Sequence, residues 1–188
     1  AYDSMREFPK AVYHYERSLD LARALGDLRS QAIALDNLGV THNEMKNYKQ
    51  AMVMHQRALD VYRELGDLPS LSATLNHLGI VSKNLKMFQE ADAFFLSSQR
   101  MKEELQDLRG LSSVLINRAI LHAIQRHWDE VDDLVKRALT ISDDISYGHP
   151  VAIAHYLSGL RHLELGQPSD VVQAFIRSIV VGKNHGIH

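Results

Sequence analysis

The apolar positions of this chain follow the period of an α-helix and not that of a strand. In residues 28–46 the apolar side chains do not alternate cleanly with polar ones, and they fit one helix: Ile33, Leu35, Leu38, Val40 and Met45. No strand pattern appears elsewhere in the sequence. We therefore expect helices near residues 8–25, 28–46, 48–65, 68–86, 88–105, 108–126, 128–145, 149–165 and 168–183.

The pattern itself repeats along the chain at a fixed interval. Leu25-Gly26-Asp27 returns as Leu65-Gly66-Asp67, and a small residue recurs at one position of the first helix in each period: Gly39, Gly79, Ala119 and Gly159. A large apolar side chain recurs where the second helix of each period begins: Phe8, Tyr48, Phe88 and Trp128. The period is 40 residues. A fixed period of this length is typical of a solenoid, in which each unit buries its apolar face only against its neighbours.

Local signals at the period boundaries indicate where helices begin and end. Gly26 and Gly66 are expected to end one helix, and Asp27 and Asp67 to cap the next. Asn47, with a Gln three residues later, has the spacing of a capping box for the second helix.

Together these columns resemble the tetratricopeptide repeat, which places a Leu-Gly pair in the first helix and alanines in the second, after an aromatic residue. One unit matches with Leu38-Gly39, Tyr48, Ala51 and Ala58, and the next with Leu78-Gly79, Phe88 and Ala91. The 40-residue period is similar to the variant found in kinesin light chains, spindle-orienting adaptors and bacterial regulators. The resemblance implies an all-α fold, a right-handed α-solenoid of stacked antiparallel helix pairs.

On this basis the chain is expected to be a single array over residues 1–188, with about four and a half repeats. The repeats would comprise residues 1–27 (partial), 28–67, 68–107, 108–147 and 148–188. Because Ala1 falls within a first helix and the chain stops where another unit would begin, we expect it to be a fragment of a longer protein.

Composition limits the classes of function. The net charge is −2 with no run of Lys or Arg, so nucleic-acid binding by a basic surface is not expected. No apolar run approaches the roughly 18 residues needed to span a bilayer, so no membrane partner is expected. The absence of cysteine excludes thiol chemistry and favours a cytoplasmic location.

The histidines and acidic pairs do not suggest a metal or catalytic site at this stage. His42, His122 and His162 occupy the same position in different repeats, which places them too far apart for one zinc ion, and no His-Glu-x-x-His occurs. Half-buried packing between helices is the simpler interpretation. There is no phosphate-binding Gly-rich loop and no nucleophile elbow. We therefore expect no cofactor, no metal and no enzymatic activity.

The resemblance places a binding surface on the concave face, which in this family is lined by the first helix of each unit. The residues so implicated are Asp36, Asn37, Val40, Asn43, Glu44, Asn76, His77, Ile80, Lys83, Asn84, Asn117, Ile120 and Tyr156. Amides there can hold the backbone of an extended peptide, and Val40, Ile80 and Ile120 can receive its side chains. The competing interpretation is that the asparagines only bridge neighbouring helices.

The resulting hypothesis is a protein–protein interaction module that binds a peptide or a partner helix in its groove. Two alternatives stay open. The chain could be a ligand-sensing or self-associating segment of a larger signalling or transcriptional regulator, as in bacteria, or an accessory domain that positions a catalytic module lying outside it.

Overall fold

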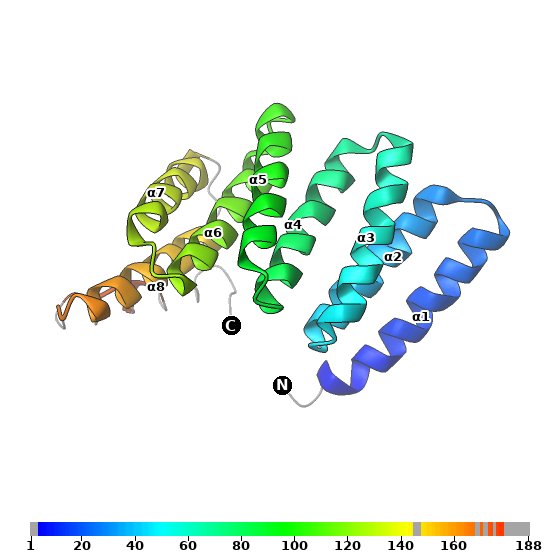
Figure 1. Cartoon of the computed structure of the whole chain (residues 1–188), viewed down its shortest axis with the longest axis horizontal. Coiled ribbons are helices and arrows are strands. Elements are labelled where there is room, and N and C mark those ends of the chain that lie inside the picture. The colour runs from blue at the N-terminus through cyan, green and yellow to red at the C-terminus, as the bar shows by residue number, and fades with distance from the viewer. Residues whose placement is uncertain (1–3, 145–147, 168–169, 171–172, 175, 179–188) are drawn as a thin grey trace. The chain divides into compact units, whose positions relative to one another are not determined.

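The computed structural model describes residues 4–144, 148–167, 170, 173–174 and 176–178. Within these residues every regular element is a helix, as the sequence pattern predicts. The eight helices, shown in Figure 1, are α1 (Ser4–Ala24), α2 (Leu28–Glu44), α3 (Tyr48–Leu65), α4 (Leu68–Asn84), α5 (Phe88–Glu104), α6 (Leu108–Ile124), α7 (Trp128–Asp144) and α8 (Gly148–Glu164). The ninth predicted helix, at 168–183, falls largely outside the described residues.

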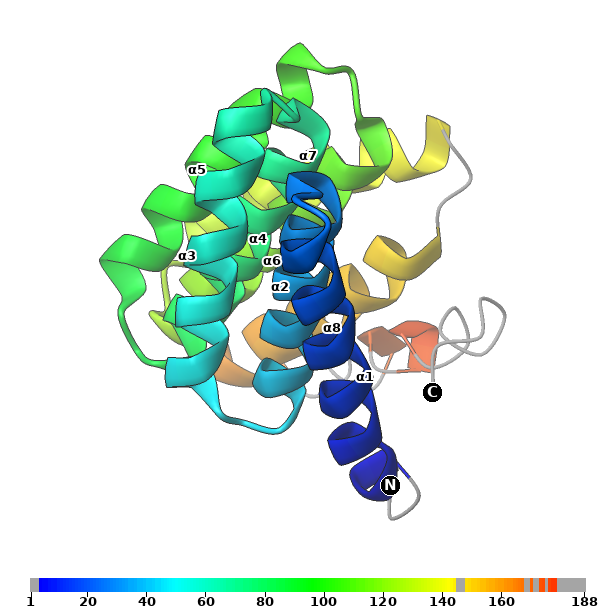
Figure 2. The same ribbon diagram turned by 90° about the vertical axis from the view of Figure 1, so that its right-hand side faces the viewer.

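The chain forms two compact units, the first ending at Met101 and the second beginning at Lys102. In the first unit, consecutive helices run in alternating directions and pack as pairs, α1 on α2 and α2 on α3, and α4 packs on α3 (Figure 1). The first helices α2 and α4 also contact each other. Figure 2 shows α3 on the outer side of α2 and α4. The second unit repeats this scheme: α7 packs on both α6 and α8, and α6 also contacts α8.

The core of the first unit lies between these helices. One cluster joins α1, α2 and α3 through buried side chains that include Leu19, Leu35, Leu38 and Tyr62. The small column predicted from the sequence is confirmed, because a Cβ atom added at Gly79 would lie 2.5 Å from two ring carbons of Phe95. The backbone of α4 thus approaches a fully buried ring of α5, and a larger residue at Gly79 would have to displace it.

Hydrogen bonds link the two helices of a pair at a constant sequence separation. Ser98 donates to the carbonyl of Ser72 at 2.7 Å, Ser112 donates to that of Ala138 at 3.1 Å, and Ser178 donates to that of Ala152 at 2.8 Å. The separation is 26 residues in each case. The recurrence shows that the pairs share one packing register in both units.

The predicted caps are confirmed at Asp27 and Asp67 and wrong at Asn47. Asp27, Asp67 and also Asp107 each accept a hydrogen bond from the backbone N–H three residues later, at the start of α2, α4 and α6. Asn47 precedes α3 but its side chain caps nothing. Its backbone, at φ −83° and ψ 59°, is not in the extended conformation of a usual N-cap residue.

First helices end earlier than the sequence predicts. We expected residues 28–46 to be helical, whereas α2 ends at Glu44 and Lys46 takes a left-handed conformation with φ 62°. Lys86 and Arg126 do the same after α4 and α6. Because these turns contain no glycine, the usual signal for such an ending is missing.

At the other end of the first unit, α1 begins at Ser4 and not near residue 8, so Pro9 lies inside the helix. Proline keeps a helical φ and removes one backbone donor, which the helix tolerates here. None of the described helices is long and apolar enough to cross a membrane.

Candidate protein-binding surface

The predicted binding residues lie on the first helices of the pairs. Ten of the thirteen lie in the first unit, on α2 and α4, which pack against each other. Asn117 and Ile120 lie on α6, and Tyr156 lies on α8, in the second unit. All thirteen side chains retain some exposure, with Glu44 and Tyr156 the most exposed. None of the thirteen is withdrawn into the core.

Two polar contacts connect α2 to α4 across this surface. The amide of Asn84 donates to the side-chain oxygen of Asn43 at 2.9 Å. Asp36 and His77 form the second contact, with 3.3 Å between the carboxylate Oδ2 and the ring Nδ1. Both pairs are separated by 41 residues. These residues therefore act as inter-helix contacts in the free chain, the competing role considered above.

Asp36 also contacts His55 of α3. The sequence analysis did not assign His55 to the binding surface. The distance from Asp36 Oδ1 to His55 Nδ1 is 2.7 Å, and the rings of His55 and His77 lie 5.1 Å apart. His55 is only 1% exposed, while the side chains of Asp36 and His77 keep 17% and 30%. One carboxylate therefore joins two imidazoles at the edge of the core.

Local packing explains why the ring of His55 can reach this position. A Cβ atom at Gly39 would lie 2.5 Å from the ring, so the absent side chain of Gly39 makes room for it. One repeat later Gly79 makes the same room for Phe95. The recurring combination of a glycine in the first helix with a ring in the second was the signal that could have located His55.

The surroundings of Asp36 and His55 shift the pKa values of both groups. Burial, the largest influence, would raise the pKa of Asp36, but the hydrogen bonds and charges of His55 and His77 outweigh it and hold that pKa well below its usual range. Burial lowers the pKa of His55, and the hydrogen bond with Asp36 opposes this only in part. Near neutral pH the pair is therefore a carboxylate with a neutral imidazole.

Lys83 is another half-buried charged group of this surface. It lies on α4, and burial lowers the pKa of its ammonium group. Burial thus makes the charged form of Lys83 less favourable in the free chain. An acidic group of a partner placed beside the ammonium group would stabilise that charge.

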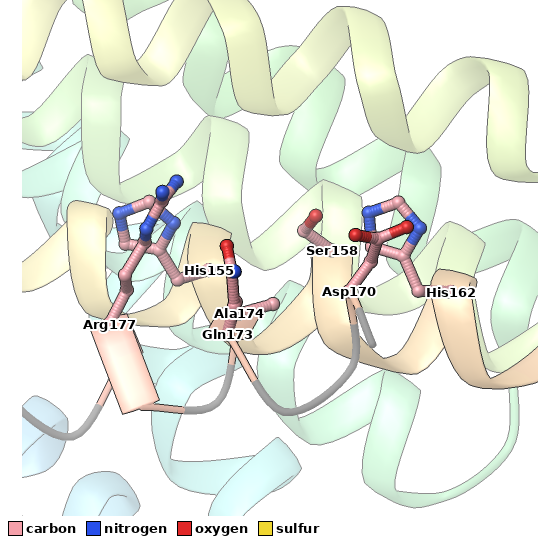
Figure 3. A pocket seen from close by; sticks show the side chains of 7 residues that line it. All are labelled: His155, Ser158, His162, Asp170, Gln173, Ala174 and Arg177. Atoms are coloured by element: carbon pink, nitrogen blue, oxygen red, sulfur yellow. The ribbon is translucent and has the colours of Figure 1, made fainter. Parts of the chain in front are cut away.

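In the second unit a polar pocket of about 230 Å³ lies beside α8. Figure 3 shows His155, Ser158 and His162 of α8 on one wall, facing side chains of the following segment. The facing residues are Asp170, Gln173, Ala174 and Arg177. Burial, and secondarily the charge of Arg177, lower the pKa of His155. Sequence analysis did not single out this pocket.

The remaining histidines and acidic pairs agree with structural roles. His42, His122 and His162 are half-buried, as expected for rings packed between helices. The ring Nδ1–H of His162 donates a 2.8 Å hydrogen bond to the side-chain Oε1 of Gln167. Asp129 and Glu130 lie in the first turn of α7 and face water. Their negative charges interact favourably with the positive end of the helix dipole there.

Comparison with known proteins supports the resemblance seen in the sequence. Residues 2–64 match the model of the tetratricopeptide repeat. The described helices form the antiparallel pairs of helical-repeat proteins. No curated protein sequence matches the chain.

Three solved structures share the fold at low sequence identity. The chain is similar to BtubC (BKLC) from P. vanneervenii, with 15% identity and a TM-score of 0.77, over 94% of this chain and 74% of that one. It is similar to aspartyl phosphate phosphatase F from Bacillus subtilis, with 14% identity and a TM-score of 0.83, over 98% of this chain and 50% of that one.

A Rap protein complexed with competence and sporulation factor gives 12% identity and a TM-score of 0.81, over 96% of this chain and 49% of that one. The chain thus spans about half the length of these last two proteins. At such identities the likeness establishes the fold alone.

Proposed function

We propose that this chain binds a protein partner, presented as an extended peptide or a helix, on the surface formed by the neighbouring first helices α2 and α4 of its first unit. The carrying observation is that α2 and α4 contact each other and place ten predicted residues, polar and apolar, at partial exposure on neighbouring helices. The family and a neighbour solved with a bound factor support a partner of this kind.

An apolar side chain of α2 adds to this proposal, since Ile33 is 47% exposed. A peptide or helix that covers Ile33 would gain the free energy of its burial.

The polar contacts between α2 and α4 suit this function. Asn43 and Asn84 satisfy each other in the free chain, and each amide keeps a second polar group for the backbone of a peptide. Asp36 and Lys83 provide charges of opposite sign, which would fix the direction and register of a partner.

The test begins with capture of partners by the purified chain and continues with affinity measurements for the partner identified. We expect Ile33→Ala and Glu44→Ala to weaken binding with little change in thermal stability, because both side chains are exposed on α2. Val53→Ala on α3, an exposed apolar residue of a second helix, is the matched control and should bind normally. Normal affinity of the first two variants, with a loss in the control, would place the binding surface on the second helices and contradict the proposal.

The alternatives predict other outcomes. Self-association in a larger regulator predicts a concentration-dependent mass in light scattering of the chain alone. An accessory role predicts that a captured partner is a catalytic module whose activity depends on this chain. That the chain itself catalyses no reaction, and that it acts in the cytoplasm, both stay predictions.

A further inference from the structure

The cluster of Asp36, His55 and His77 contains the donor types of a metal site. It brings together one carboxylate and two imidazoles from α2, α3 and α4, with ligand atoms that all lie within 4.8 Å of one another. Carboxylate oxygen and imidazole nitrogen are both zinc ligands. The groups come from three different helices of one well-packed unit, so the fold holds them in place without the help of a loop.

The distances are close to those of a tetrahedral zinc site. Zinc–nitrogen and zinc–oxygen bonds of about 2.0–2.2 Å place neighbouring ligand atoms roughly 3.3 Å apart. Here Asp36 Oδ1 lies 2.7 Å from His55 Nδ1 and 3.4 Å from His77 Nδ1, and the three ligand atoms all lie within 4.8 Å of one another. Small side-chain rotations would therefore bring the three donors to bonding distance of one ion.

Helix stacking does not require this cluster. The three equivalent positions one repeat later hold Asn76, Phe95 and Asn117, and two repeats later Ile116, Val135 and Leu157. The ring beneath the glycine can thus be apolar, as Phe95 is beneath Gly79. A buried carboxylate with an imidazole is costlier to desolvate than such a ring. Departures from a local packing rule of this kind are expected at functional sites.

We infer that Asp36, His55 and His77 bind one zinc ion, with a fourth position open on the exposed side of the cluster. Asp36 supplies the negative charge that offsets part of the charge of the ion. Gly39 and the packing of α3 hold the buried His55 ring, and His77, the most exposed ligand, closes the site from α4. The fourth ligand is a water molecule, or a side chain of a bound partner. Asp36 and His77 also belong to the proposed partner-binding surface, but zinc binding by the chain alone is measured without a partner, so either proposal can fail without the other.

The test uses substitutions that the chain already contains at equivalent positions. His55→Phe imports the residue at position 95, Asp36→Asn that at 76, and His77→Asn that at 117. His42→Ser, which imports Ser82, removes a histidine outside the cluster and is the matched control. All variants are made in a chain lacking His185 and His188, so that the terminal His-x-x-His cannot bind the probe.

The metal-free chain is titrated with ZnCl2 by calorimetry, and with Co²⁺ to detect the visible absorption of a tetrahedral site. We expect one tight site per chain in the parent and in His42→Ser. Loss of a direct ligand should weaken binding by more than the roughly 10–100-fold that loss of an outer contact costs. Zinc should raise the thermal midpoint of the parent and not of His55→Phe.

Two results would overturn the inference. One is a parent chain that binds no zinc at 100-fold molar excess. The other is binding of equal affinity in the parent, His55→Phe and His77→Asn, which would assign the metal to other histidines. If His55→Phe does not fold, His77→Asn, at a half-exposed position that an asparagine occupies in two other repeats, decides alone.

Discussion

The contact between Gly79 and Phe95 allows a sharp test of how the helix pairs are held together. A Cβ atom at Gly79 would lie 2.5 Å from Phe95 Cδ1 and Cε1, against about 3.5–4.0 Å for carbons in favourable contact. The overlap is therefore about 1 Å or more. Phe95 is fully buried and has no exposed side to move towards. We expect Gly79→Ala to destabilise the chain by about 1–3 kcal/mol.

The chain itself suggests the compensating change. At the same two positions one repeat later it has Ala119 and Val135, a larger residue opposite a smaller one. Phe95→Val alone should open a cavity, at a cost of roughly 2–4 kcal/mol by comparison with other large-to-small changes. In that background the added methyl group of Gly79→Ala fills space and no longer overlaps a ring. The double variant should therefore be more stable than the sum of the two single changes predicts.

The measurement is thermal and urea unfolding of the two single variants and the double variant. For a chain of this size about 2 kcal/mol corresponds to a shift of roughly 4–8 °C in the midpoint. A coupling energy of about 1 kcal/mol or more is expected, as for residues in contact. Additive effects within about 0.3 kcal/mol would refute the explanation, because they would show that the cost of Gly79→Ala does not arise from the ring of Phe95.

Three further predictions concern single residues. Gln106→Gly should stabilise the chain by up to about 1 kcal/mol in urea unfolding, because residue 106 takes a left-handed φ of 56°, and no gain would show that this turn is unstrained. Asp107→Ala should lower the thermal midpoint more than Asp27→Ala, because both cap a helix but only Asp107 also pairs with the buried ammonium of Lys102, at 3.0 Å; equal losses would contradict this. The pKa of His55 is lowered by folding, so below about pH 6.5 the unfolded chain binds more protons than the folded chain, and the free energy of unfolding should fall as the pH drops. The dependence of that free energy on pH should be weaker in His55→Phe. An unchanged dependence would refute the assignment of this effect to His55.

Much of the fold could be predicted because the chain repeats its own packing. Four small residues at one spacing located the close approach of helices, and the structure confirms it at Gly39 and Gly79. The aspartate after each period boundary located the caps of α2 and α4. The ends of first helices could not be predicted, because Lys46, which takes the left-handed turn, carries no sequence signal for it.

From the sequence, Asp36 and His77 were assigned to a binding surface and no metal was expected, and His55, which contacts Asp36, was not assigned to any site. Histidines that share a column, such as His42 and His122, are kept at least a full repeat apart by stacking, so their spacing could not reveal a metal site. The structure instead joins neighbouring columns. Residues 19 apart meet within a helix pair, as Asp36 and His55 do, and residues 41 apart meet between first helices, as Asp36 and His77 do.

These sequence separations distinguish residues that stacking of the helix pairs requires from residues with a separate functional role. A contact that stacking requires should recur at its separation in other repeats, as the serine hydrogen bonds at 26 residues do in three pairs. The combination of an acid with two histidines at these separations occurs at Asp36 and is absent at the equivalent positions 76, 116 and 156, where the sequence has Asn, Ile and Tyr. The other repeats stack without this acid and these two histidines. Stacking therefore does not explain the free-energy cost of placing these polar groups in or near the core. The same comparison supplies a replacement for each group that the fold already tolerates, so loss of function and loss of structure can be measured separately.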